Sequence, residues 1–477
     1  MKAHPMIAIL AVVIAGLLLL DYFKPSALLY QTEYEAIDSL RTYTFVLRGE
    51  PKETKRCWRY EAVVQGVGRV YLYILRDTTR TQPQAGDTLV ARTRIRRGGQ
   101  IGDFDYGLYL RRQGFIGTAF TAKYQLSNTY HPSKKPFLQA HLYKRLAASG
   151  LSGDELATTG ALTLGYKEDL DPQLRQHFQA SGAAHVLAVS GLHTGIIYAI
   201  LLVLFTIGGR LKPRYENRPG RVAFGLVIIA AMWFYAWLTG LTPSVVRSVL
   251  MITMVEVGRM LYRQSLTLNS IAAAAVLILL ARPLDLWSIS FQLSFAATTA
   301  IVLFVDDIER LLPQEQIQRS NKLLNWFIGT IIVSLAAQLG TLPITMYTFG
   351  QMSNYFMLTN LIVLPVATLL VPCGMLSIAL GGCWLGRMIG YITYGLAWTM
   401  NHAVAWIESL PGSTIAVHIN GWQMLLLYAA IAFGWLALHP NFFTHSLTPS
   451  LTPSLTNLFW LLPTAAALIG FCIMYIL

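Results

Sequence analysis

The feature that most constrains this chain is a series of long apolar segments, each close to the length of a membrane-spanning helix. A helix needs about 20 residues to cross a hydrocarbon core roughly 30 Å thick. Only 13% of the 477 residues are charged and 54% are hydrophobic, which excludes an ordinary soluble protein. The candidate spans are residues 6–20, 185–206, 222–240, 244–261, 267–281, 287–305, 326–348, 355–381, 388–407, 421–438 and 458–477.

Two of these segments, 6–20 and 267–281, are short, so the sequence predicts a multi-pass helical membrane protein with nine to eleven spans. Basic residues between the second and third spans, such as Arg210 and Lys212, mark the cytoplasmic side by the positive-inside rule. This orientation places residues 21–184 outside the inner membrane.

The chain is expected to have five parts. They are a membrane anchor and connector (1–40), a basic β domain (41–131), amphipathic surface helices (132–184), a helical membrane domain (185–440), and a linker with a last span (441–477). The first segment should remain as an anchor, because Leu17–Asp21 offers no small-residue cleavage site. Asp171 and Pro172 predict the start of a short surface helix.

Strand-like segments replace the apolar runs in the second part. They are Thr44–Arg48, Trp58–Val67, Arg69–Asp77, Thr88–Arg96 and Gly114–Thr121. These segments are rich in Val, Tyr, Thr and Ile, and Gly, Pro and Asp separate them. Five short strands favour a small closed barrel of the OB type, with a small sandwich as the alternative.

Positive charge is concentrated in this β domain. Residues 41–130 hold 16 Lys or Arg against 7 Asp or Glu. Arg92, Arg94 and Arg96 alternate along one predicted strand, so all three should project from the same face, and Arg97 extends the row.

Such a row fits a surface that follows phosphates, with Tyr71 and Tyr73 on a neighbouring strand as a stacking platform. A solvated strand face and a surface for anionic lipid headgroups are the alternatives. The residues alone leave the three interpretations open.

Polar residues within the predicted spans are the second group of candidates. Ser190 and His193 lie three apart and share a helix face. Three interpretations compete: hydrogen bonds to neighbouring helices, the lining of a polar path, and a Ser–His nucleophile pair that would also need an orienting acid.

Thr242 and Pro243 predict a helix start that places Arg247 about one turn into the membrane, where it either snorkels outward or faces a hydrated path. Gln292, Gln338 and Asn360 add one polar group to each of three later spans. A central path lined by these residues is one interpretation, and hydrogen bonds between helices are the other.

Cysteine and histidine spacing predicts no metal site and no cofactor. The four cysteines are scattered, and no His-x-His-x-Asp-His cluster occurs in the sequence.

Five motifs together resemble the ComEC family of DNA-internalisation competence proteins. They are Gly102–Gly114, Ala161–Gly165 with Leu170-Asp171 after it, His185–Gly195 with its Ser-Gly-Leu-His element, Pro243–Arg247, and Phe291–Phe295. The resemblance implies an extracytoplasmic OB-like domain and a helical channel domain for single-stranded DNA.

Many members of that family add a metallo-β-lactamase-like domain thought to degrade the other strand. The absence of its metal-ligand cluster leads us to expect no nuclease activity and no enzyme function here, with a separate nuclease preparing the DNA. The partners that the resemblance implies are single-stranded DNA, a DNA receptor and a cytoplasmic helicase, besides membrane lipid.

The expected function is a channel of the inner membrane that carries single-stranded DNA into the cytoplasm during natural transformation. A membrane-embedded hydrolase or acyltransferase using Ser190 and His193 is one alternative. A transporter of another polyanion, such as a glycan or a lipid-linked phosphate, is the other.

Overall fold

The chain forms two compact units in the computed structural model. The first comprises Met1–Ala140 and Ala275–Ser288, and the second comprises His141–Ala274 and Ile289–Leu477. The structure describes residues 5–23, 39–54, 56–76, 82–84, 86–101, 104–128, 137–167, 169–187, 189–206, 218–261, 267–313, 321–439 and 463–464. The loop that carries Arg210 and Lys212, the linker and nearly all of the last predicted span lie outside the described residues.

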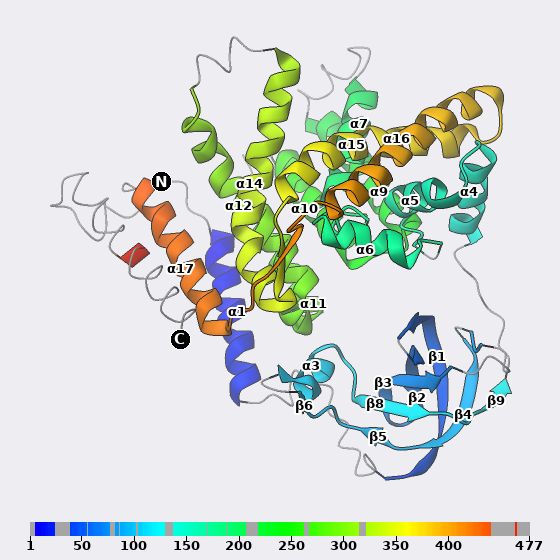
Figure 1. The fold of residues 1–477 in the computed structure, drawn as a ribbon. Helices are drawn as coiled ribbons and strands as arrows, with labels where there is room; N and C mark the ends of the chain where they lie inside the picture. The colour runs from blue at the N-terminus through cyan, green and yellow to red at the C-terminus, as the bar shows by residue number, and fades with distance from the viewer. Residues whose placement is uncertain are drawn as a thin grey trace. The chain divides into compact units, whose positions relative to one another are not determined.

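A β-barrel is the centre of the first unit (Figure 1). Its strands are β1 (Arg41–Glu53), β2 (Cys57–Val64), β3 (Gly68–Leu75), β4 (Thr88–Thr93), β5 (Ile95–Arg96), β8 (Gly117–Thr121) and β9 (Gln125–Asn128). All five predicted strands are present, and the fourth is divided into β4 and β5. The short strands β6 (Gln100–Ile101) and β7 (Phe104–Asp105) pair separately, and helix α3 (Tyr106–Arg112) follows them.

The strand order shows why the sheet curls into a barrel. The order is β5-β8-β3-β2-β1-β4-β9, with β3 and β8 parallel. Because only Arg94 separates β4 from β5, these two strands form one bent strand that pairs with β1 at one end and with β8 at the other. The result is an OB-like closed order and not the alternative sandwich.

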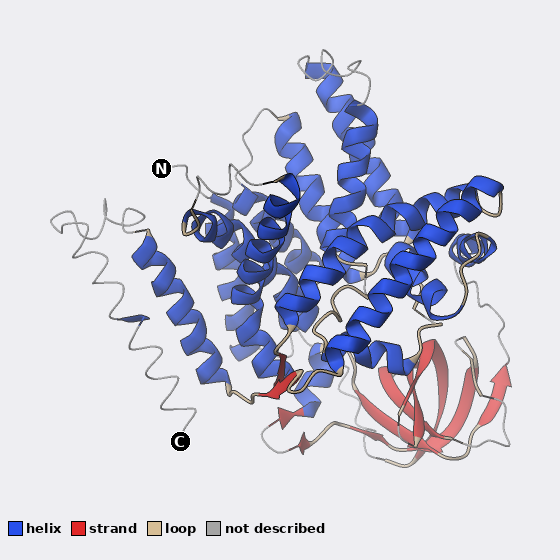
Figure 2. Ribbon diagram, turned by 45° about the horizontal axis from the view of Figure 1, so that its top comes forward, coloured by secondary structure: helices blue, strands red, loops and turns tan. Residues whose placement is uncertain are grey.

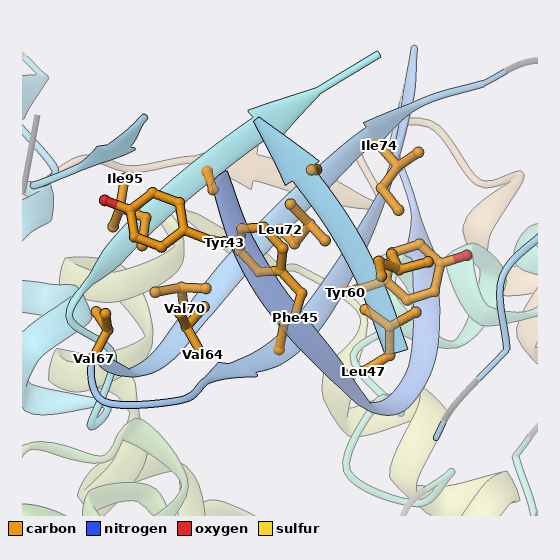
Figure 3. Close-up of a cluster of buried hydrophobic side chains, with 14 residues drawn as sticks. Tyr43, Phe45, Leu47, Tyr60, Val64, Val67, Val70, Leu72, Ile74 and Ile95 are labelled. Carbon is orange, nitrogen blue, oxygen red and sulfur yellow. The ribbon is translucent and has the colours of Figure 1, made fainter. Parts of the chain in front are cut away.

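The barrel interior is filled by alternate residues of these strands, as a period of two requires. Phe45, Leu72 and Leu89 are fully buried, and Figure 3 shows the first two within the cluster of core side chains. The hydroxyl of buried Tyr60 donates to the carbonyl of Pro83 at 2.8 Å, and burial raises the pKa of Tyr60, so that it remains a neutral donor.

Helices make up nearly all of the rest (Figure 2). The predicted spans correspond to α1 (Pro5–Phe23), α7 (Gly191–Thr206), α9 (Arg218–Leu238), α10 (Pro243–Met260), α11 (Thr267–Ala281), α12 (Ile289–Arg310), α14 (Lys322–Phe349), α15 (Phe356–Leu380), α16 (Trp384–Glu408) and α17 (Gly421–Leu438). The 3-10 helix η1 (Pro283–Trp287) precedes α12, and strands β10 (Gln351–Ser353) and β11 (Thr414–Ala416) pair with each other. Every predicted span that falls on described residues therefore contains a helix, although α7 begins only at Gly191, so the first described residues of the span 185–206 precede the helix.

Among the described residues, five helices are long and apolar enough to cross a membrane. They are Pro219–Leu238, Ile289–Arg310, Leu324–Phe349, Phe356–Leu380 and Gly421–Leu438. Helices α1, α7 and α11 are apolar but shorter, and α10 carries three ionisable residues within 18 positions. The protein is thus a helical membrane protein with an inserted β domain, and five of the nine to eleven predicted spans meet both requirements.

The surface-helix region contains α4 (Phe137–Ala148), α5 (Gly153–Leu164) and α6 (Pro172–Ala180). Helix α6 begins as predicted, because Asp171 accepts the N–H of Gln173 at 2.8 Å and Pro172 is the first helical residue.

The surface prediction is wrong for α5, whose residues 157–164 are all buried and which packs against α15 and α16. The region was predicted to hold amphipathic surface helices, but the polar hydroxyls of α5 are satisfied internally. Thr159 and Thr163 donate to carbonyls of their own helix, and Thr158 donates to Asn401 Oδ1 at 2.9 Å.

Candidate functional site

The arginine row lies on the outside of the barrel. Arg92, Arg94 and Arg96 are exposed, whereas the residues between them, Thr93 and Ile95, point into the core. The predicted shared face is therefore present, with adjacent arginines separated by about 7 Å along the strand. Thr93 fixes this register, because its hydroxyl donates to the carbonyl of Phe120 at 2.6 Å.

The charge of this row is uncompensated within the described part of the chain. Arg97 is also exposed and follows β5 directly. None of the four arginines forms an ion pair with a residue that the structure describes. A mobile anion can therefore approach them without displacing a protein carboxylate.

Tyr71 does not supply the open stacking platform that the sequence predicted. Its ring stacks on Phe115, with centroids 3.9 Å apart, and the Arg59 guanidinium lies 4.9 Å from its centroid. These partners come from opposite sides of β3, because β2 carries Arg59 and Phe115 lies two residues before β8. Burial raises the pKa of Tyr71, which keeps its hydroxyl neutral in this stack.

Tyr73 is also engaged within the protein. It lies close to Tyr106 of α3, and burial, followed by the neighbouring Tyr73, raises the pKa of Tyr106. The two tyrosines predicted to stack on bases thus help to hold α3 and the segment before β8 on the barrel.

Phe120 is the exposed aromatic residue that the sequence interpretation missed. It lies on β8 and is 55% exposed, while its neighbours Ala119 and Thr121 face the core. An alternating strand pattern would place the large apolar Phe120 inside and the threonine outside. Gly117, Ala119 and Thr121 occupy the inward positions of β8, and at Gly117 only glycine fits, because an added Cβ would lie 2.4 Å from the carbonyl oxygen of Arg96.

In the second unit, Ser190 and His193 meet at the start of α7. His193 Nδ1 accepts the backbone N–H of Ser190 at 2.9 Å and lies 3.0 Å from Ser190 Oγ. Ser190 directly precedes the helix, so a side chain three residues later caps its N–H as Glu or Gln does in a capping box. His193 is fully buried.

Three of the five family-like motifs, Ala161–Gly165, His185–Gly195 and Pro243–Arg247, converge around this helix start, directly or through an adjoining residue. Gly165, at φ +70°, approaches Thr239 so closely that a Cβ would lie 3.1 Å from the Thr239 oxygen and 3.5 Å from Val189 Cγ2. A Cβ on Gly191 would lie 3.2 Å from Ser248 Oγ. The close approaches join the segment after α5, the start of α7 and both sides of the α9–α10 connection.

Arg247 extends the cluster to α12. It is only 5% exposed, and one guanidinium nitrogen donates to Ser290 Oγ at 2.8 Å. Helix α10 begins at Pro243 as predicted, but the side chain of Thr242 makes no capping hydrogen bond. An arginine this buried does not snorkel to the membrane surface, so the snorkelling alternative does not apply to this structure.

Of the other predicted path residues, Gln292 adjoins this cluster in sequence, whereas Gln338 and Asn360 lie on other helices. Gln292 is on the first turn of α12, close in sequence to Ser290, while Gln338 is on α14 and Asn360 on α15, and all three are half-buried. No hydrogen bond or ion pair within the described residues joins Gln338 or Asn360 to Arg247. No cluster of three or more potential metal ligands occurs among the residues searched, which are those that the structure describes.

Comparison with known proteins assigns the helical unit to a family. The family model described as Competence protein matches residues 162–441, more than half of the chain. ComE operon protein 3 of Bacillus subtilis (strain 168) is 28% identical over 335 residues, covering 69% of this chain and 40% of that protein. No solved structure matches the chain.

Two further relatives agree. Recombination protein 2 of Haemophilus influenzae (strain ATCC 51907 / DSM 11121 / KW20 / Rd) is 22% identical over 282 residues, covering 58% of this chain and 35% of that protein. Competence protein ComA of Neisseria gonorrhoeae is 28% identical over 160 residues, with coverages of 34% and 23%. The matched part spans less than half of each of the three relatives. The extent of the family match, together with the converging motifs, shows that this chain belongs to the competence protein family, the ComEC family of its sequence motifs.

Proposed function

We propose that this protein carries single-stranded DNA across the inner membrane into the cytoplasm during natural transformation. The observation that carries the proposal is the exposed arginine row, whose charge no described carboxylate compensates. Family membership favours DNA as the ligand of this basic face, since relatives are named for competence and recombination. The barrel, on the extracytoplasmic side, binds the strand through Arg92, Arg94, Arg96 and Arg97.

The helical unit provides the path through the membrane in this proposal. A phosphate entering a low-dielectric layer needs a positive or hydrogen-bonding wall, because its desolvation is otherwise severe. Arg247 supplies a permanent charge, and Ser190, His193, Gln292, Gln338 and Asn360 supply further polar groups. Since Arg247 and His193 are buried here, the path must open between α7, α10 and α12 before a strand passes.

The hydrolase alternative is less favoured because the histidine nitrogen that would accept the serine proton already accepts a structural hydrogen bond. Neutral imidazole has one acceptor nitrogen, and here Nδ1 already accepts the N–H of Ser190. The pair caps α7, and the helix start explains the geometry without a nucleophile. We therefore propose a transporter and not an enzyme. Single strands would come from a separate nuclease, with a DNA receptor outside and a helicase inside as partners.

The decisive experiment follows labelled DNA into each compartment. A strain lacking the gene is complemented with the wild-type protein or an empty vector, and label is measured outside the inner membrane and in the cytoplasm. We expect normal label in the outer compartment and loss of cytoplasmic label in the deletion. Equal cytoplasmic label with and without the gene would disprove the transport function.

Three variants separate a wall role for Arg247 from helix packing. If Arg247 only joins α10 to α12, Ser290→Ala removes the same hydrogen bond and should reduce uptake as much as Arg247→Gln. If its charge lines the path, Arg247→Gln should lose most uptake, Arg247→Lys should keep part of it, and Ser290→Ala should be mild. Uptake is compared at matched membrane abundance. Equal losses in Arg247→Gln and Ser290→Ala would refute the wall role.

A further inference from the structure

The β2–β3 side of the barrel, the surface on which OB folds usually bind nucleic acid, is occupied by the protein itself. Arg69 lies over Phe115 at 4.6 Å, Phe115 stacks on Tyr71, and Arg59 lies over Tyr71. Arg69 is also paired with Glu61 at 3.0 Å. These contacts use the aromatic faces that a base would need.

The free aromatic face is one strand further around the barrel, at Phe120. The β5–β8 register pairs Ile95 with Ala119, which places Arg94 across from Phe120 in the antiparallel ladder. The β3–β8 register pairs Tyr73 with Phe120 on the other side. Cross-strand neighbours on one face have Cβ atoms about 5 Å apart. Phe120 therefore lies directly beside the middle of the arginine row.

We infer that Phe120 is the stacking platform for one unpaired base, whose flanking phosphates contact the arginine row. This inference rests on the proposed DNA function and specifies its site. An exposed phenylalanine beside arginines offers a ring face and anion-binding groups at the spacing of a single nucleotide. The base must be unstacked to use the ring, so this residue favours single strands over duplex DNA.

A lipid surface is the competing ligand for the same groups. Membrane insertion needs a contiguous apolar face, but the exposed residues nearest to the row are polar. Thr42 pairs with Arg92, and Thr118 pairs with Arg96. Tyr73 is the neighbour of Phe120 on β3, whereas Arg94 on the β5 side and Thr118 on β8 are polar neighbours, so this surface fits a base better than it fits an acyl chain.

The test measures the binding of fluorescent oligothymidine and of a duplex to the full-length protein in nanodiscs of zwitterionic lipid. Phe120→Ala should weaken single-strand binding by roughly 5- to 150-fold, the usual range for loss of one stacked base. Its salt dependence should stay at the wild-type slope, because no charge is removed. Phe120→Trp should retain single-strand binding, and duplex affinity should not change in either variant.

The matched control is Leu126→Ala on β9, which truncates another exposed apolar residue of the barrel, 39% exposed in the wild type. We expect wild-type single-strand binding in this control. An equal loss in the two alanine variants, or an equal loss for both kinds of DNA in Phe120→Ala, would overturn the stacking role. Loss of binding to anionic vesicles alone would assign Phe120 to lipid and overturn the inference.

Failure of the inference is distinguishable from failure of the proposed function. If the wild-type protein binds no single strand at any salt concentration, the DNA-binding role of the barrel is wrong. If it binds and removal of the arginines weakens binding, but Phe120→Ala does not, only the stacking inference is wrong.

Discussion

Replacing Arg92, Arg94 and Arg96 together by alanine should reduce the salt dependence of single-strand binding. For single strands, the logarithm of the binding constant falls with the logarithm of salt concentration with a slope of about −0.7 per neutralised phosphate. Three exposed arginines, spaced about 7 Å apart and paired with no carboxylate that the structure describes, can each contact one phosphate. The variant should therefore lose about 2 from the magnitude of this slope.

The same calculation gives the expected affinities. Between 50 and 200 mM salt, the three contacts account for roughly a 20-fold fall in wild-type affinity that the variant should not show. The assay is fluorescence anisotropy of labelled oligothymidine with the full-length protein in nanodiscs, titrated at four or more salt concentrations.

Two controls make this result specific. Replacing the three arginines by lysine keeps the charge and should keep the slope. Replacing three exposed cations elsewhere in the domain, Arg48, Arg56 and Lys123, changes net charge by the same amount and should affect the slope much less. An unchanged slope in the alanine variant would show that the row is a solvated face, and equal effects of both alanine sets would show that only net charge acts.

Three further predictions concern how the site is built. Gly117→Ala should destabilise the barrel by about 1–3 kcal/mol, because its Cβ would lie 2.4 Å from a β5 carbonyl oxygen, and hydrogen exchange of β5 and β8 measures this. Arg112→Asp should destabilise the first unit by about 1.5–3 kcal/mol, because it removes the 2.7 Å ion pair with Asp21. If the ion pair is responsible, the double variant Arg112→Asp/Asp21→Arg should recover the wild-type Tm. Ser190→Ala should keep most uptake, because the backbone N–H of residue 190 still reaches His193. Loss of the serine side chain at the helix start should lower the free energy of unfolding by about 0.5–2 kcal/mol. Complete loss of uptake at normal abundance would favour catalysis.

The sequence alone determined which segments are helices and strands, because periodicity and apolar length are local properties. Each predicted span on described residues contains a helix, and the five predicted strands form the barrel. The outward face of Arg92, Arg94 and Arg96 also followed from the sequence, since alternate residues of a strand point to opposite sides.

The tertiary structure decided which side chains are available to a ligand. Tyr71 is a residue type suited to stacking on a base, but Phe115 and Arg59 cover its ring. Phe120 is exposed because Gly117, Ala119 and Thr121 take the inward positions of β8, and the close approach of β5 leaves room only for a glycine at the first of them. Such contacts depend on register and closure of the sheet, which the pattern of one strand does not specify.

Burial of polar residues in the helical unit was likewise decided by tertiary packing. Residues 132–184 were predicted to form surface helices, but the threonine hydroxyls of α5 bond to helix carbonyls and to Asn401, and this helix is buried. Arg247 had a predicted position one turn into α10, and only the structure placed Ser290 of a later helix beside it. A polar side chain is buried when a partner satisfies it, and the identity of that partner depends on segments far away in the sequence.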